Sequence, residues 1–112
     1  MEEIVERTLL FDFYGELLTE HQRAFYEDVV FNDMSLSEAA EVYGVPRQAA
    51  HDLLKRCDRM LLGYEEKLKL LERFTKLRKT AEEIGTLLSG SPGDSGTWQA
   101  LKGKYRELLD EI

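Results

Sequence analysis

Cysteine, proline and long apolar runs are scarce in this 112-residue sequence, which has one cysteine and two prolines. A single cysteine excludes an internal disulfide and is typical of a reducing compartment. No apolar run approaches the roughly 18 residues that a membrane-spanning helix needs. The first residues, MEEIVER, are acidic, which is unlike a signal peptide. We therefore expect a cytoplasmic protein without a membrane span.

Basic residues are also in the minority, since the net charge is −7 and the sequence pI is about 4.9. This balance argues against a protein that coats nucleic acid, because such binding normally needs a basic surface. The charge is unevenly distributed, however. Residues 1–45 carry eleven acids and two bases, residues 46–79 carry five acids and ten bases, and residues 80–112 carry six acids and three bases. The central segment alone is basic, and it can hold an anionic partner.

The sequence has no motif typical of a metal site or of a catalytic site. His21 and His51 are thirty positions apart, and neither has a ligand three or four residues away, so zinc is not expected. Cys57 falls on the apolar side of its predicted helix, which favours a buried structural thiol over a redox switch. Glycine-rich phosphate loops and nucleophile elbows are missing from the sequence. We expect no enzyme activity and no cofactor.

Helical spacing is the only periodicity in the sequence, since strand-like alternation is absent. We therefore expect an all-α fold. The first two helices are predicted over residues 3–14 and from Thr19, in a capping box with Gln22, to about Phe31. The predicted organisation is a helix-turn-helix domain over residues 1–62, followed by a C-terminal helical extension over residues 63–112.

The helix-turn-helix motif is predicted over Ser35–Arg59. Ser35 and Glu38 have the spacing of a capping box, which starts the first helix. Gly44 is placed to end that helix in the left-handed conformation. Pro46 then suits the first position of the second helix, since its φ is already helical. Two short helices joined by a glycine-containing turn are typical of a motif whose second helix enters a DNA major groove.

The polar side of that second helix contains the candidate nucleic-acid-binding residues. Early positions can contact base edges, and arginine and glutamine can bond them bidentately. Later positions suit phosphates. The candidates are Arg47, Gln48 and His51 for bases, and Lys55, Arg56 and Arg59 for phosphates. A solvated polar face has the same pattern, and docking on a protein without nucleic acid is the alternative function.

The C-terminal extension has two heptad-spaced apolar stripes. One helix is expected from near Tyr64, after Gly63, to about Leu88, and another from near Trp98, with a flexible loop between them. The spacing fits either an antiparallel hairpin within one chain or a homodimer. We predict the homodimer, because two motif copies can bind paired half-sites. Its predicted contacts are Leu70, Phe74, Leu77, Ile84, Leu88, Trp98, Leu101 and Tyr105.

Residues 9–61 resemble the YlxM (p13-like) family of bacterial helix-turn-helix proteins. LFDFYGELLT at residues 10–19 is the most specific part, and YEEKLKLLERF at residues 64–74 also fits. Residues 19–59 are similar to the promoter-reading region 4 domain of sigma factors, through LT-x-x-Q-R, S-x-x-E and an R-Q-A sequence. The chain departs from the family at Pro46, where Ser is common, and at Ala50 and His51, where aromatic residues or Val are common.

The resemblance implies a nucleic-acid-binding accessory or regulatory protein of the signal recognition particle pathway. The implied partners are DNA or RNA, including the particle's own RNA, together with the particle's GTPase. The family is associated with this pathway chiefly because its genes neighbour those of the particle's GTPase. The resemblance does not distinguish DNA from RNA.

Overall fold

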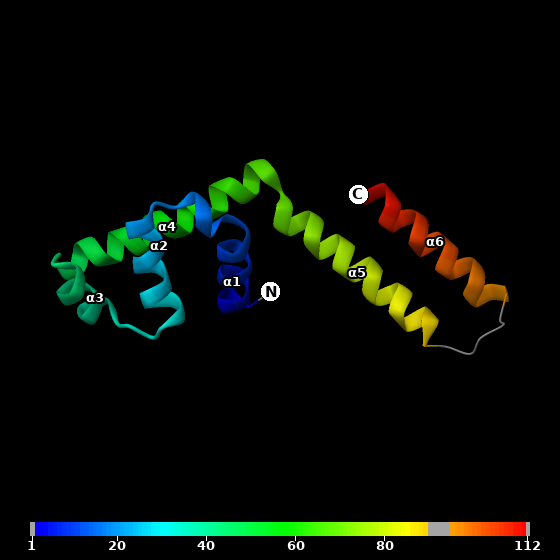
Figure 1. Cartoon of the computed structure of the whole chain (residues 1–112), viewed down its shortest axis with the longest axis horizontal. Coiled ribbons are helices and arrows are strands. Elements are labelled where there is room, and N and C mark those ends of the chain that lie inside the picture. The colour runs from blue at the N-terminus through cyan, green and yellow to red at the C-terminus, as the bar shows by residue number, and fades with distance from the viewer. Residues whose placement is uncertain (1, 90–94, 112) are drawn as a thin grey trace. The chain divides into compact units, whose positions relative to one another are not determined.

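The computed structural model describes residues 2–89 and 95–111 and is all-α, as predicted (Figure 1). Those residues contain no strand. The helices are α1 (Glu3–Tyr14), α2 (Glu20–Tyr26), α3 (Leu36–Tyr43), α4 (Arg47–Leu68), α5 (Leu70–Leu88) and α6 (Ser95–Glu111). A 3-10 turn, η1 (Gly15–Leu17), follows α1, and a π-helical turn, η2 (Glu27–Phe31), extends α2.

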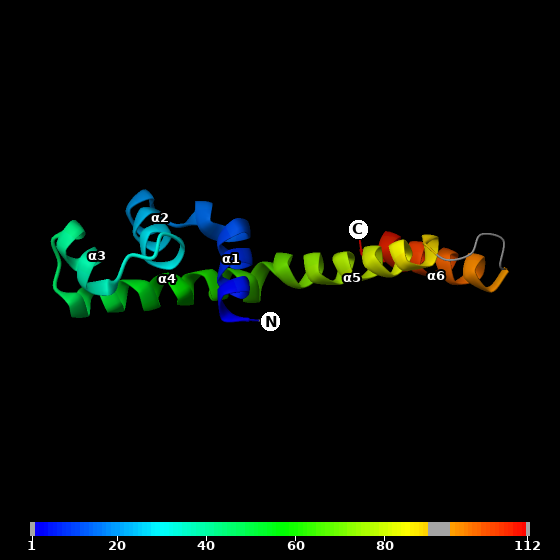
Figure 2. The ribbon, with the colours of Figure 1, turned by 90° about the horizontal axis from the view of Figure 1, so that it is seen from below.

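The chain divides into two compact units, Met1–Lys69 and Leu70–Ile112. In the N-terminal unit α1, α2 and α3 all pack against α4, with α2 and α3 on the same side of it (Figure 2). Phe25 of α2 is fully buried against three alanines, Ala39 and Ala40 of α3 and Ala50 of α4. Because alanine side chains are small, the two motif helices approach closely and the phenyl ring fills the space between three helices.

The core continues along α4 toward its C-terminal end. The buried side chains there come from α1, the segment after η1, α2 and α4, and they are Leu10, Tyr14, Leu18, Tyr26, Cys57 and Leu61. The predicted burial of Cys57 is confirmed, since none of its surface is exposed. Burial raises the pKa of its thiol to about 11, so the reactive thiolate is disfavoured.

The predicted helix boundary at Gly63 is wrong, because α4 continues through Gly63 to Leu68. A helical glycine costs only about 1 kcal/mol relative to alanine, and tertiary contacts on both sides outweigh that cost. Leu61 is fully buried, and the Tyr14 hydroxyl donates a hydrogen bond of 2.5 Å to Glu65 Oε1. The helix ends instead at Leu68. Lys69 is its C-cap, with φ of 55°, and donates its N–H to the Glu65 carbonyl at 2.8 Å.

Two other predicted helix starts also shift. Pro46 is the N-cap of α4 and not its first helical residue. Its φ of −63° would suit a helix, but its ψ of 152° is extended. The last helix begins at Ser95, three residues before the predicted start at Trp98. Small polar residues resemble a loop by composition, yet serine and threonine are favoured at helix starts. Residues 90–94 of the predicted loop lie outside the described residues.

In the C-terminal unit α5 and α6 lie side by side and run antiparallel (Figure 1). Lys104 of α6 forms an ion pair with Glu83 of α5. This hydrogen bond lowers the pKa of Glu83 and raises the pKa of Lys104. The unit therefore contains the hairpin that the sequence left open as an alternative to dimerisation.

Candidate nucleic-acid interface

The turn between α3 and α4 has the predicted construction. The N–H of Glu38 donates to Ser35 Oγ at 3.1 Å, and the N–H of Ser35 donates to Glu38 Oε1 at 3.4 Å, which completes the capping box. Gly44 is left-handed, with φ of 66°. The N–H of Val45 donates to the Ala40 carbonyl at 3.0 Å, as in a Schellman motif. Local chemistry thus ends α3 and redirects the chain into α4.

Tyr43 fixes the end of α3 to the helix before it. Its hydroxyl donates a hydrogen bond of 2.7 Å to Asp28 Oδ2, and its ring meets the Phe25 ring edge-on at 5.5 Å. The His21 ring lies edge-on against the same tyrosine at 5.4 Å. Burial, followed by the hydrogen bond to Asp28, raises the pKa of Tyr43 to about 12. The hydroxyl therefore stays a donor over the ordinary pH range.

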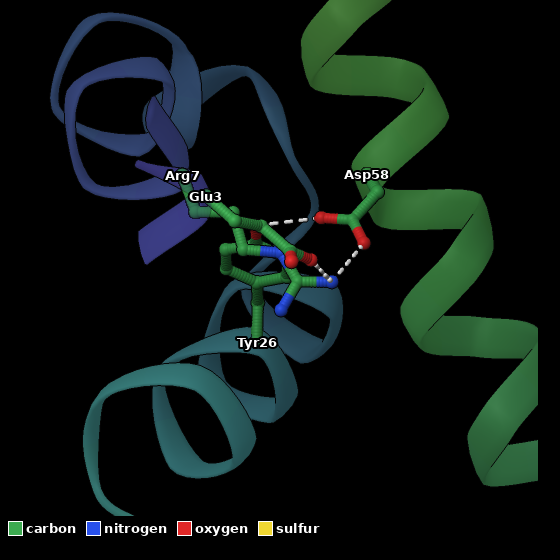
Figure 3. Close-up of polar contacts among 4 residues, drawn as sticks. All are labelled: Glu3, Arg7, Tyr26 and Asp58. Atoms are coloured by element: carbon green, nitrogen blue, oxygen red, sulfur yellow. Dashed lines mark hydrogen bonds and ion pairs between the residues drawn. The ribbon is translucent and has the colours of Figure 1, made fainter. Parts of the chain in front are cut away.

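Asp58 fixes the middle of α4 to α1 and α2 (Figure 3). The Tyr26 hydroxyl donates to its Oδ1 at 2.7 Å, and Arg7 Nη2 donates to its Oδ2 at 2.7 Å. Burial and the bond to Asp58 raise the pKa of Tyr26. Partial burial lowers the pKa of Arg7, but its hydrogen bond and attraction to Asp58 give a net increase. One carboxylate thus joins three helices and sets the orientation of α4.

Sequence reasoning missed Asp58 and Glu65 as structural acceptors. The two acids are seven residues apart on a helix whose other side is basic, so they lie on the same side of α4. That spacing, together with the tyrosines in the preceding helices, could have indicated that Asp58 and Glu65 accept hydrogen bonds from the core. Their hydrogen-bond partners, Tyr26 and Tyr14, are 32 and 51 residues away along the chain. Local sequence patterns do not predict contacts over such separations.

Five of the six predicted contact residues lie on the exposed side of α4. Within the described residues, the side chains of the four cations among them form no ion pair or hydrogen bond with the protein. The exposed residues are Arg47, Gln48, Lys55, Arg56 and Arg59. Four positive charges along about three helical turns make an electrostatically favourable surface for a phosphate backbone.

His51 differs from the other five, because its side chain is only 39% exposed. Its Nδ1 atom is buried and has no hydrogen-bond partner in the described part of the chain. The same atom lies 3.7 Å from Asp52 Oδ1. Only the outer edge of the ring is therefore available to a ligand.

Asp52 is an exposed residue of this surface that was not among the predicted contacts. Its Oδ1 accepts a hydrogen bond of 3.0 Å from Gln48 Nε2. The bond holds the Gln48 amide along the helix, and the carboxylate repels phosphates nearby. An aspartate oxygen can also accept a hydrogen bond from the amino group of cytosine. Asp52 thus separates the early positions, Arg47 and Gln48, from the later cations.

The first turn of α4 has no side-chain cap, since Pro46 has no cap oxygen. The first backbone N–H groups of a helix lack intrahelical partners. Such N–H groups, aligned with the helix dipole, favour an anion such as phosphate. The start of α4 therefore adds uncharged donors to the four cations.

The predicted dimer contacts fall into two groups. Leu77, Ile84 and Leu101 are half-buried, whereas the other five predicted contacts are exposed to different extents. The exposed contacts are Leu70, Phe74, Leu88, Trp98 and Tyr105.

The described residues contain no cluster of three or more histidine, cysteine, aspartate or glutamate side chains that could hold a metal ion. None of the helices described is both long and apolar enough to cross a membrane.

Comparison with known proteins matches residues 1–93 to a family described as "Putative helix-turn-helix protein, YlxM / p13 like". The chain is 48% identical over 113 residues to a UPF0122 protein of Desulforamulus reducens, covering 99% of this chain and 97% of that protein. It is 48% identical over 79 residues to a UPF0122 protein of Clostridium botulinum, covering 70% and 72% of the two chains. It is 42% identical over 91 residues to the UPF0122 protein YlxM of Bacillus subtilis, covering 81% and 83%.

Proposed function

Because the chain belongs to the YlxM/p13-like helix-turn-helix family, we propose that it binds nucleic acid through the exposed side of α4. The observation that carries this proposal is the set of four exposed cations on that side, which form no ion pair or hydrogen bond with the described part of the protein. The remaining side of α4 is occupied by α1, α2 and α3. The helix is thus held rigidly while its cations stay available.

The proposed roles follow position along α4. Arg47 and Gln48 contact base edges, with Asp52 orienting the glutamine amide, and the outer edge of His51 adds a third contact. Lys55, Arg56 and Arg59 neutralise phosphates. The uncapped N–H groups of the first turn bind one further phosphate. The acidic segments at residues 1–45 and 80–112 repel the phosphate backbone, which favours one binding orientation.

The proposed setting is the signal recognition particle pathway in the cytoplasm, where the protein acts as a non-enzymatic accessory or regulator. The target is DNA or RNA, including the particle's RNA, and the particle's GTPase is the proposed protein partner. The family resemblance supports this setting. We also propose that the protein acts as a homodimer, which would present two copies of the motif.

A protein-docking function is the second candidate, and one observation favours it. A groove of about 340 Å³ lies beside the turn of the motif, lined by Val45, Ala49 and Leu53 and by the charged residues Asp52 and Arg56. Apolar side chains at such a surface suit a protein partner. In this alternative, α4 contacts a protein and no nucleic acid.

The test compares single substitutions by fluorescence anisotropy with a panel of DNA duplexes and RNA hairpins. Arg47→Ala should change the preference among targets, whereas Lys55→Ala should weaken all of them alike. Lys67→Ala is the matched control, because Lys67 is an exposed lysine in the last turn of the same helix. If all three variants bind every nucleic acid like the wild type, the proposed interface is wrong.

The same assay separates the two candidate functions. A lysate pull-down with and without nuclease complements it, because a partner held through nucleic acid is lost on nuclease treatment. A partner that docks in the groove beside the turn is retained, and Leu53→Glu should then release it. Retention of every partner after nuclease treatment, with no anisotropy change on any target, would favour the docking function.

A further inference from the structure

The hairpin of α5 and α6 uses only one side of each helix for its internal contact. In α5 the covered positions include Leu77, Thr80 and Leu87, and in α6 they include Lys104 and Leu108. These positions are three, four or seven residues apart, so they lie along one side of each helix. The Glu83–Lys104 ion pair joins the same two sides.

A second apolar side remains exposed on each helix of the hairpin. Trp98, Tyr105 and Leu109 in α6 are 57%, 56% and 51% exposed, and Leu88 in α5 is 67% exposed. At 100° per residue, the three α6 positions lie about a quarter turn away from the side that faces α5. The hairpin therefore cannot cover them itself.

The two exposed sides form one continuous surface. A groove of about 360 Å³ runs between the helices and is lined by residues of both, including Ile84, Leu88, Trp98 and Tyr105. We call this surface the apolar face and define it as Ile84, Leu88, Trp98, Leu101, Tyr105 and Leu109. Among the described residues that line the groove, Lys102 alone is charged, and its Nζ lies 5.5 Å from the centre of the Trp98 ring.

Another groove of the hairpin is polar by contrast. It is lined by charged side chains of both signs and by Thr80, and the charged residues are Lys76, Lys79, Glu83, Lys104, Glu107 and Asp110. An antiparallel helix pair with one apolar and one charged surface has the pattern of half of a four-helix bundle.

The size of the unit argues that the apolar face is covered. Among its described residues only Leu71 and Thr80 are buried, so the hairpin has little core of its own. A small unit with so little core gains stability by covering its apolar surface with a partner. The described residues of this unit contain no cysteine and no cluster of side chains that could hold a metal ion.

The area of the apolar face is sufficient for a dimer. Aromatic side chains bury roughly 150–250 Å² each. Trp98 and Tyr105, each more than half exposed, together with the smaller Leu88 and Leu109, also more than half exposed, and the partly covered Ile84 and Leu101, offer roughly 500 Å² per chain. Two such faces would bury about 1,000 Å² in total, which is the lower limit for a specific interface. A twofold axis would let the aromatic side chains of each copy enter the groove of the other.

We propose that the homodimer put forward above forms through the apolar face, with the α5–α6 hairpins of two copies packed as an antiparallel four-helix bundle. This inference rests on that proposed homodimer and names its interface. The near absence of charge on the face favours an identical face over a charged partner. The interface does not use α4, so it stands or falls independently of nucleic-acid binding. If both proposals hold, the bundle brings two motifs into one particle.

The test is sedimentation equilibrium of the full chain at tens of micromolar. The expected mass is twice the 13.0 kDa of the monomer. Trp98→Glu and Leu88→Glu should raise the dimer Kd by at least about 30-fold, because each removes a central contact and buries a charge. Gln99→Glu is the matched control, since it adds the same charge beside Trp98 at an exposed position outside the apolar face.

A second measurement needs no substitution. Trp98 is the only tryptophan in the sequence, so its emission reports on the apolar face alone. Dilution of the wild type should shift the emission to longer wavelength as the dimer dissociates, and Leu88→Glu should show the shifted emission at every concentration. A monomer mass for the wild type at tens of micromolar, or a dimer that both Trp98→Glu and Leu88→Glu leave intact, would overturn the proposal.

Discussion

The two units of this protein differ in how much of their apolar surface they bury. The N-terminal unit covers its own core, with Phe25, Tyr26, Ala39 and Ala50 fully buried, and it adds hydrogen bonds between tyrosines and carboxylates across helices. The C-terminal unit buries two described side chains and leaves four large apolar ones more than half exposed. A unit of the first kind can position a binding helix, whereas a unit of the second kind is suited to association.

The largest expected effect is the loss of a core side chain from the N-terminal unit. Phe25→Ala should lower the free energy of unfolding by about 3–5 kcal/mol, because it leaves a cavity among four helical segments. Leu88→Ala should cost less than about 1 kcal/mol in the monomer, because the side chain is 67% exposed. Urea denaturation at low protein concentration measures both values. Similar losses in the two variants would contradict the contrast between the units.

The next largest effect concerns the junction of three helices at Asp58. Asp58→Ala leaves the Tyr26 hydroxyl and the Arg7 guanidinium without their acceptor, and should cost about 2 kcal/mol. Asp52→Ala is the control on the same helix, and its exposed carboxylate should matter by less than about 0.5 kcal/mol. Thermal or urea unfolding of the two variants distinguishes them. A double-mutant cycle with Tyr26→Phe should show coupling, and an additive result would argue against the hydrogen bond.

Alkaline pH should weaken the N-terminal unit in a defined range. Burial raises the pKa of the Cys57 thiol from 9.0 to about 11. Its contribution to stability is therefore complete below pH 9 and is lost as the pH rises toward 11, because only the unfolded chain releases the proton readily. The slope from this group is about 1.4 kcal/mol per pH unit. Urea unfolding at several pH values should show a smaller slope in Cys57→Ala, and an unchanged slope would be the contrary result.

The smallest effects separate two glycines of the N-terminal unit. Gly63→Ala should stabilise α4 by about 0.5–1 kcal/mol, since a Cβ there would meet no atom within 4 Å and the backbone is helical. Gly44→Ala should destabilise by about 1 kcal/mol, because φ is 66° at that position. Unfolding midpoints of the two variants should move in opposite directions. A shift in the same direction would show that the boundary of α4 or the turn is assigned wrongly.

Much of the fold could be predicted because its signals are local. The capping boxes at Thr19 and Ser35 and the left-handed Gly44 each depend on groups within five residues, and the structure contains all three. The continuation of α4 past Gly63 could not be predicted in the same way. It depends on contacts with residues some fifty positions earlier, such as Tyr14, and local propensity for a break is weak beside them.

The candidate site shows the same division. Exposure of Arg47, Lys55 and Arg59 followed from their position opposite the apolar side of one helix. The partial burial of His51 and the hydrogen bond from Gln48 to Asp52 could not be predicted in this way, because both depend on side-chain conformations. Heptad spacing in the C-terminal unit identified apolar positions but not which side of α5 would face α6, since several sides of that helix carry apolar residues.

The salt dependence of binding tests the central claim most directly. If Lys55, Arg56 and Arg59 each neutralise one phosphate, a plot of log affinity against log salt should have a slope of about −2.7 on DNA duplexes, because the uncharged N–H groups at the start of α4 release no counterion. Lys55→Ala should reduce the slope by about 0.9, and Lys67→Ala should leave it unchanged. A slope near zero, or equal changes in the two variants, would contradict nucleic-acid binding through the exposed side of α4.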